Sequence, residues 1–260
     1  MNGPNNPIGW TDFTWNPITG CKHGCRFGPQ QAKCYAEVIA ERFRGTKSWP
    51  TGFDPAFHPA RLNEPMRVRE SARIFCCSMS DLFGGWNNPT WIARTLDAID
   101  AAHWHTFQLL TKAPWLVERH EIPVNAWMGT TITGGLANEQ HRLDCVRRFR
   151  ARVRFVSCEP MEGPVDIARA EPDWIIIGAA TGAGGYQPTE AWVALLERWA
   201  DANNVPIYHK DNLTIRPKKR HEWPAGHSAD ARPRADVARP TRQDQDPFRL
   251  TAPMSCSADG

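Results

Sequence analysis

Seven short apolar segments, rich in β-branched and aromatic residues, recur along the first 210 residues of this 260-residue chain. Stretches with a helical spacing of apolar residues separate them, which is the pattern of repeated β–α units around a parallel sheet. Several segments are apolar almost throughout, as expected for strands that are covered on both faces. The predicted strands are Phe13–Ile18, Arg73–Met79, Thr106–Thr111, Ala126–Ile132, Arg154–Cys158, Trp174–Ala179 and Pro206–His209.

Three of the intervening segments have readable helical patterns. Asn88 and Pro89 can cap and begin one helix, and Thr189 can cap another. The apolar residues of both helices fall on one face, and we assign them to the core rather than to cofactor contacts. Between Arg142 and Arg154, six arginines accompany an apolar stripe, which predicts a solvated amphipathic helix that runs into the next strand.

The length and charge of the chain predict one domain and a tail. A single α/β barrel commonly has about 200–250 residues, so we assign residues 1–212 to one such domain. Residues 213–260 mix Pro, Arg, Asp and Ala without periodicity, which predicts a basic, disordered or loosely attached tail. The first 212 residues contain equal numbers of basic and acidic residues, so the tail carries the whole net charge of +3. A domain that binds phosphate over a broad surface is therefore not supported.

The sequence predicts no membrane segment. Its longest strongly apolar run, Trp174 to Ala180, is far shorter than the roughly 18 residues that span a bilayer. The N-terminal stretch lacks the basic start and apolar core of a secretion signal, so we expect a cytoplasmic protein. In that compartment, eight cysteines are better explained as reduced thiols and metal ligands than as disulfides.

Three of these cysteines, Cys21, Cys25 and Cys34, lie in one stretch, GCKHGCRFGPQQAKCYAE. Its glycines and proline allow the chain to bend so that the thiolates converge. Three thiolates can hold an iron–sulfur cluster and leave one iron without a protein ligand, where a substrate or cofactor can bind. Three other cysteines lie inside apolar runs, where we expect small buried side chains: Cys76, Cys77 and Cys158.

A structural zinc ion is the leading alternative for this loop, and a loop without metal is another. Zinc would use the three thiolates together with His23 or His58 as the fourth ligand. Two features favour a cluster. No fourth ligand lies at a usual zinc-finger spacing, and the loop follows the first predicted strand, where β/α folds place their ligands.

Seven segments in a fixed order resemble a known family. They are WNPITGC, the loop ending in CYAE, SMSDLF, FQLLTK, FVSCEP, DWIIIG and VPIYHK, and they extend from about Ile8 to Lys210. They are similar to phage-associated proteins of unknown function that are related to the radical S-adenosylmethionine (SAM) enzymes. The resemblance implies a partial (β/α) barrel of the radical SAM type with about six or seven parallel strands. It also implies a [4Fe–4S] cluster on Cys21, Cys25 and Cys34, with SAM on the open iron.

Two segments depart from that family's pattern. Radical SAM loops usually read C-x3-C-x2-C with an aromatic residue before the third cysteine, whereas this chain reads C-x3-C-x8-C with Lys33 in that position. Relatives tend to end the sixth strand in Gly-Gly-Glu-Ser-Gly, but residues 178–182 read GAATG here. A carboxylate that could help to hold the cofactor or substrate is therefore missing.

The resemblance implies a radical SAM enzyme. A reduced cluster, supplied by an external one-electron donor, would cleave SAM into methionine and a 5′-deoxyadenosyl radical that removes hydrogen from an unidentified substrate. We expect a nucleoside or a nucleic acid as the substrate class. The alternative is a non-enzymatic zinc-binding or nucleic-acid-interacting module, in which basic residues of the tail contact phosphates: Arg216, Lys218, Lys219 and Arg220.

Polar residues that follow the predicted strands are the expected cofactor-binding set, because β/α barrels build their sites at the carboxyl ends of strands. Their hydroxyls and carboxylates could bind the amino and ribose groups of SAM: Ser78, Ser80, Asp81, Thr130, Thr131, Ser157 and Glu159. Lys112 and Lys210 could meet its carboxylate or an anionic substrate. Asp81 and Glu159 stand out because a carboxylate in a barrel mouth is costly unless it meets a cation or donor. For each residue singly, a structural cap or salt bridge is the alternative, and no catalytic residue is assigned.

Overall fold

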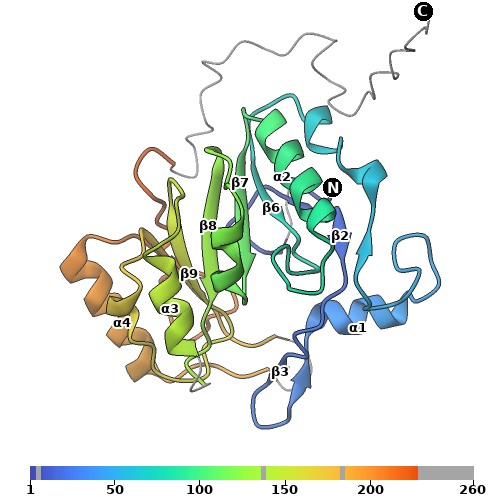
Figure 1. Ribbon diagram of the computed structural model, residues 1–260. Helices are drawn as coiled ribbons and strands as arrows, with labels where there is room; N and C mark the ends of the chain where they lie inside the picture. The colour runs from blue at the N-terminus through green and yellow to red at the C-terminus, as the bar shows by residue number, and fades with distance from the viewer. Residues whose placement is uncertain (4–6, 136–138, 182–184, 228–260) are drawn as a thin grey trace, which may run out of the picture.

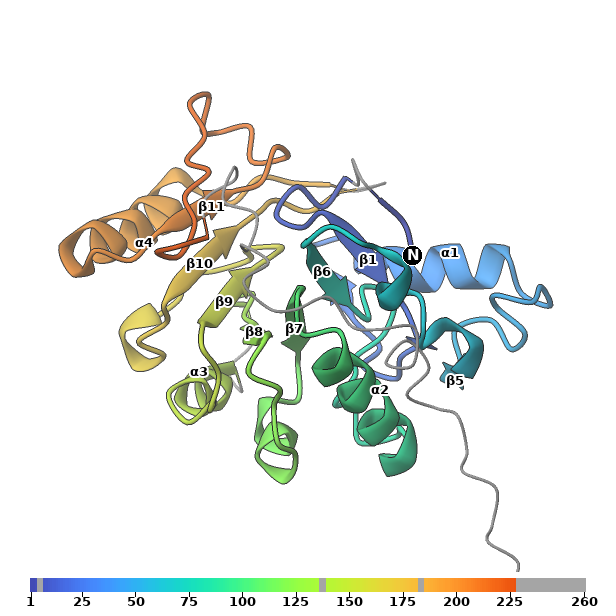
Figure 2. The same ribbon diagram turned by 90° about the horizontal axis from the view of Figure 1, so that it is seen from above.

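A curved, seven-stranded parallel sheet forms the centre of the protein. The computed structural model describes residues 1–3, 7–135, 139–181 and 185–227. The strands follow one another across the sheet in chain order, and the sheet bends into an open arc (Figure 2). This partial (β/α) barrel confirms the predicted fold class and all seven predicted strands. The strands are β1 (Phe13–Trp15), β6 (Arg73–Cys76), β7 (Thr106–Thr111), β8 (Ala126–Thr131), β9 (Arg154–Cys158), β10 (Trp174–Ile177) and β11 (Ile207–His209).

Helices cover the outer side of the arc (Figures 1 and 2). The two helices with predicted caps begin at those residues: Asn88 accepts a hydrogen bond from Thr90 N at 2.8 Å, and Thr189 accepts one from Trp192 N at 3.4 Å. The α-helices are α1 (Tyr35–Arg42), α2 (Pro89–Ala101), α3 (Gln140–Val146) and α4 (Glu190–Asn203). Short 3₁₀ turns are η1 (Pro59–Arg61), η2 (Pro65–Arg67), η3 (Pro114–Arg119) and η5 (Ile167–Arg169).

Two predicted elements are shorter than expected. The arginine-rich helix α3 ends at Val146, because Arg148 and Phe149 donate to carbonyls only three residues back and so tighten the chain into turns. The first predicted strand divides at Pro17, which has no N–H for the ladder. Two short antiparallel pairs lie beyond it in the chain: β2 (Ile18–Thr19) with β5 (Ala56–Phe57), and β3 (Arg26–Phe27) with β4 (Ala32–Lys33).

The two faces of the sheet bury different side chains, since neighbouring residues of a strand point to opposite faces. In β10, Ile175 and Ile177 join the larger core, which also contains buried residues of α2, α3 and α4. Trp174 and Ile176 join a second, mostly aromatic core. As predicted, the cysteines of the apolar runs are buried small side chains: Cys76, Cys77 and Cys158.

The aromatic core also includes residues from both ends of the described chain. Trp10 precedes β1, and Trp223 follows β11 and stacks on Trp174 with ring centroids 5.1 Å apart. Trp174 Nε1 donates to the carbonyl of Glu222 at 2.9 Å, and Leu213 is fully buried. Residues 213–227, which we expected to belong to a loose tail, are therefore part of the body. Their few large apolar anchors lie in a segment without periodicity, which concealed them in the sequence.

Three of the four basic residues named at the start of the expected tail have partners within the described protein: Arg216, Lys219 and Arg220. Arg216 binds Glu197 at 2.7 Å and Glu190 at 2.9 Å, and Arg220 binds Asp201 at 2.9 Å. Lys219 donates to two backbone carbonyls. The rest of the predicted tail, residues 228–260, lies outside the described residues. Within the described ranges, no helix has the length and apolar character that crossing a membrane requires.

Trp174 should be among the most important residues for stability. It is fully buried and contacts the rings of Trp10, Trp127, Phe155 and Trp223. We expect Trp174→Ala to lower the free energy of unfolding by about 3–5 kcal/mol, measured by chemical denaturation, because it leaves a large cavity. Trp115→Ala, at a 44% exposed tryptophan, is the matched control and should cost less than about 1 kcal/mol. Equal losses in the two variants would contradict this role.

Candidate functional site

The cysteine loop lies at the carboxyl end of the sheet. Gly20 N donates to the carbonyl of Met79 at 3.1 Å, and Ser80 Oγ donates to the carbonyl of Gly20 at 2.6 Å. Both partners follow β6, so these bonds join the start of the loop to that strand end. Gly20 has a φ of +83°, and a Cβ there would lie 2.3 Å from the carbonyl oxygen of Asp54. Only glycine fits this position, and Cys21 follows it directly.

The three loop thiols are each partly buried, and Cys25 interacts electrostatically with both Cys21 and Cys34. Burial raises the pKa of Cys21 to about 12, and the neighbouring Asp81 and Cys25 add to this rise. Burial also raises the pKa of Cys25; the positive charge of Lys112 opposes the rise and the Cys34 thiol adds to it. The thiols therefore lie near one another and near Lys112. Metal binding at such a set must displace protons.

Asp81 fixes the segment between the first two cysteines. Its buried carboxylate hydrogen-bonds to His23 Nε2 at 2.7 Å and accepts bonds from Thr111 Oγ1 at 2.7 Å and Lys112 N at 2.8 Å. Burial alone would raise the pKa of Asp81, but the hydrogen bonds and the charge of His23 lower it below its usual range. Asp81, predicted to bind the cofactor, thus holds the histidine between Cys21 and Cys25.

The eight residues between Cys25 and Cys34 form a docked β-hairpin, β3–β4. Gly28 N at its turn donates to Glu162 Oε1 at 2.6 Å, and the hydroxyl of Tyr186 donates to the same oxygen at 2.5 Å. Gly28 has a φ of +68°, and a Cβ there would lie 2.6 Å from Tyr186 Cε1. The long spacer therefore has a defined place: it is attached to the loops that follow β9 and β10.

A cavity of about 770 Å³ lies between this hairpin and the carboxyl ends of the strands. Its walls combine charged, aromatic and thiol side chains from segments that are far apart in the sequence. Glu139, which is fully buried, accepts bonds from the N–H groups of Thr133 and Gly134 and from Arg142. The lining residues include His23, Cys25, Phe27, Gly28, Lys112, Thr133, Glu139, Arg142, Glu162, Tyr186 and Trp192.

The other predicted cofactor-binding residues lie at the same edge of the sheet, and most have partners within the protein. Ser78 Oγ exchanges hydrogen bonds with the side chain of Asn16. Thr130 Oγ1 donates to the carbonyl of Thr111 at 2.8 Å, and Thr131 and Ser157 are buried. Glu159 forms an ion pair with Lys210. Of the predicted residues, Cys25 and Lys112 line the cavity.

The donor chemistry of the loop fits an iron–sulfur cluster. One loop carries three partly buried thiols, and one of them, Cys25, lines a cavity in which a further ligand has room. His58, one expected fourth ligand of zinc, has its Nε2 engaged by Thr19 Oγ1 at 2.8 Å. Among the residues that the structure describes, no set of three or more His, Cys, Asp and Glu side chains could hold a single metal ion. The ligands of a cluster each bind a different iron and so stand farther apart than ligands of one ion.

Sequence reasoning did not identify Glu139, Glu162 or Tyr186. Glu162 is 134 residues from Gly28 in the chain, and nothing in the local pattern of either segment links them. The available signals were weak: Glu162 lies three residues after Glu159, and Tyr186 follows a glycine-rich run. Both belong to the loops after strands, where a β/α barrel places its functional residues.

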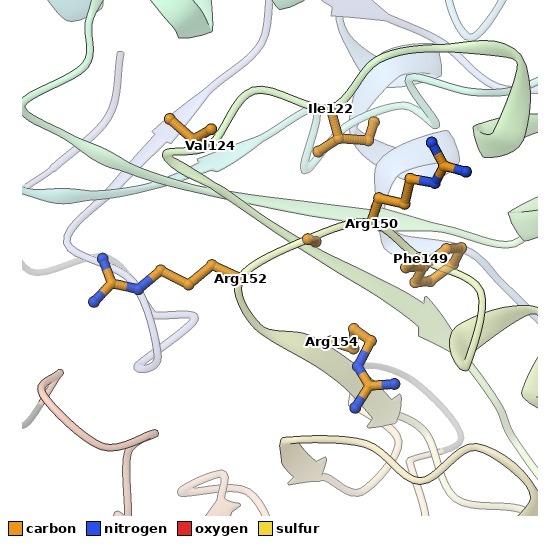
Figure 3. A pocket seen from close by; sticks show the side chains of 7 residues that line it. Ile122, Val124, Phe149, Arg150, Arg152 and Arg154 are labelled. Atoms are coloured by element: carbon orange, nitrogen blue, oxygen red, sulfur yellow. The ribbon is translucent and has the colours of Figure 1, made fainter.

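A second cavity, of about 590 Å³, lies at the opposite edge of the sheet, before β8 and β9 (Figure 3). Arg150, Arg152 and Arg154 border it together with apolar side chains. Figure 3 shows the three guanidinium groups pointing in different directions, so they do not converge on one anion. Arg154 is already paired with Asp173 at 3.0 Å. Among the described residues, no thiol, carboxylate or imidazole lines this cavity, which lies away from the cysteine loop.

A family model matches residues 5–237, almost the whole described chain. The chain belongs to the family described as "Protein of unknown function (DUF5131)". No curated protein matches the sequence.

Two of the solved structures that match are of spore photoproduct lyase. One is a double mutant with bound AdoMet and dinucleoside spore photoproduct; it is 13% identical, has a TM-score of 0.42, and the match covers 76% of this chain and 63% of that one. The other is complexed with dinucleoside spore photoproduct; it is 14% identical, has a TM-score of 0.41, and the match covers 70% and 58%. This DUF5131 chain therefore spans less than two thirds of either lyase chain.

The attachment of the β3–β4 hairpin can be measured without any metal. We expect Glu162→Ala to speed hydrogen–deuterium exchange across residues 26–33 by about tenfold, because two hydrogen bonds to one partly buried carboxylate oxygen are lost. Tyr186→Phe, which removes one of them, should have a smaller effect in the same direction.

The matched control is Glu121→Ala, an exposed glutamate at the other edge of the sheet. Its hairpin exchange should equal that of the wild type. Unchanged exchange in Glu162→Ala would show that the carboxylate does not hold the hairpin.

Proposed function

We propose that this protein is a radical SAM enzyme. In this proposal, Cys21, Cys25 and Cys34 hold a [4Fe–4S] cluster, and SAM binds the iron that lacks a protein ligand. The expected relation to phage-associated radical SAM proteins belongs to the same proposal. So does a cytoplasmic location, because that compartment keeps the thiols reduced.

The observation that carries the proposal is the position of the three thiols. One loop holds them at the carboxyl end of a partial (β/α) barrel, and Cys25 among them lines a cavity of about 770 Å³. Barrels of parallel strands build their active sites at this end. Three thiols with adjoining space suit a cluster that keeps one iron open for a ligand.

When bound, the cluster would supply the electron that cleaves SAM, and the 5′-deoxyadenosyl radical would remove hydrogen from the substrate. The chain's own residues have to hold and orient the reactants and exclude water. Lys112 presents an ammonium group to the cavity beside Cys25, where it suits a carboxylate. Ser78, Ser80, Asp81, Thr130, Ser157 and Glu159 remain candidates for contacts with SAM.

A nucleoside or nucleic acid is the proposed substrate class. Tyr186 and Trp192 offer aromatic rings in the cavity wall, on which bases can stack, and Lys112 and Arg142 offer positive charge for phosphate. We also propose that the basic segment from Arg216 onward contacts nucleic acid. Arg216 and Arg220 already form ion pairs within the protein, so they have less charge to offer to phosphates.

One contact favours the second candidate, a structural zinc site. Asp81 holds His23 through Nε2, and a carboxylate in this position commonly orients a histidine whose other nitrogen binds zinc. His23 lies between Cys21 and Cys25, and the loop would have to close further for its imidazole and the three thiolates to bind one ion, because the described residues form no such set. In this reading the protein is a metal-stiffened binding module rather than an enzyme.

Electron paramagnetic resonance separates the two candidates. We expect the anaerobically reconstituted, reduced protein to give a [4Fe–4S] signal that changes when SAM is added, because SAM would bind the open iron directly. The control carries Ala in place of Cys21, Cys25 and Cys34 and should give no such signal. Stoichiometric zinc without a cluster signal would contradict the enzyme proposal and favour the structural-metal reading.

A further inference from the structure

An exposed apolar face on α1 has no partner in the described structure. Four of the seven exposed large hydrophobic side chains among the described residues lie on or beside this helix: Tyr35, Val38, Ile39 and Phe43, which are 39–53% exposed. Their spacing of three and four residues places them on one side of the helix. We call these four residues the α1 face. Such a concentration of apolar surface on one short helix usually marks a contact with another molecule.

The α1 face lies next to the cysteine loop. Cys34 is the N-cap residue of α1, so the helix begins directly after the third thiol. The hydroxyl of Tyr35 donates to the carbonyl of Ser78 at 2.5 Å, which fixes the start of the helix to the segment after β6. In Figure 2, α1 lies beyond β1 and away from α2, α3 and α4. A molecule bound to this face would approach the loop from outside the barrel.

The chain segment that contains the α1 face has an excess of basic residues. Residues 21–50 contain six lysines and arginines but only two acidic residues, Glu37 and Glu41. Both glutamates are already paired, with Arg26 and Arg44. Within the described ranges, Lys22, Arg42 and Lys47 have no carboxylate partner. This segment therefore combines apolar contact area with positive charge, in a body whose overall charge is balanced.

We propose that the α1 face docks an acidic one-electron carrier protein of the ferredoxin type. The inference rests on the proposed function, since it names the partner that reduces the cluster. The carrier's [2Fe–2S] centre loses one electron and is oxidised, the cluster on the three thiols gains that electron, and no bond is made or broken. Apolar contacts supply affinity, and the basic residues attract the acidic partner and orient it.

Binding of a plant-type ferredoxin to the full chain tests the docking directly. Isothermal titration calorimetry at low salt should detect a complex with the wild-type protein, and added salt should weaken it. The double variant Val38→Glu with Phe43→Glu should bind about tenfold more weakly or worse, because it removes apolar contact and repels an acidic partner. Leu195→Glu, at an exposed leucine on α4, is the matched control and should bind like the wild type.

The rate of cluster reduction gives a second readout. We expect the double variant to be reduced about tenfold more slowly than the wild type by reduced ferredoxin, yet equally fast by dithionite, which needs no docking face. Because calorimetry needs no cluster, it still decides the docking question if the chain proves to hold no cluster and the proposed function fails.

Three results would overturn the inference. One is the absence of ferredoxin binding to the wild-type protein. Another is equal affinity in the wild type and the double variant. The third is a wild-type dimer that the two glutamates dissociate, without ferredoxin binding, because that would assign the α1 face to a second copy of this chain.

Discussion

The buried carboxylate of Asp81 is the interaction on which the arrangement of the site depends. It lies after β6 and accepts hydrogen bonds from His23 in the cysteine loop and from Thr111 and Lys112 at the end of β7. A carboxylate at this depth is stable only because several donors meet it. The same donors therefore tie the segment between Cys21 and Cys25 to two neighbouring strand ends.

A second carboxylate, that of Glu162, holds the β3–β4 hairpin between Cys25 and Cys34. Glu162 accepts from the turn of the hairpin and from Tyr186, so one carboxylate oxygen joins the loops after β9 and β10 to the cysteine segment. The aromatic core around Trp174 packs against the same strands near the residues where they begin. An unusual C-x8-C spacer is thereby compatible with a fixed position of Cys34, since its extra residues fold into a hairpin instead of a free loop.

The strands and the cysteine loop could be predicted because local patterns determine them. Continuous apolar runs such as Trp174–Ile177 indicate buried parallel strands, and Asn88 and Thr189 mark helix starts by their own hydrogen bonds. Contacts between distant segments could not be predicted in this way. Glu162 meets Gly28, and Trp223 stacks on Trp174, only because the sheet curves and brings them together. For the polar residues after the strands, the sequence left open a cofactor contact or a structural cap or salt bridge, and in the structure Glu159 pairs with Lys210 and Asp81 with His23.

The proposed enzyme needs a metal cluster on the cysteine loop. Anomalous diffraction shows directly which metal the loop holds. Crystals of anaerobically purified protein would be measured at the iron and zinc absorption edges. We expect an iron peak in the anomalous difference map next to the sulfur atoms of Cys21, Cys25 and Cys34, facing the cavity beside Lys112. We expect no zinc peak there. A single zinc ion bound by the three thiolates and His23 would contradict the enzyme proposal.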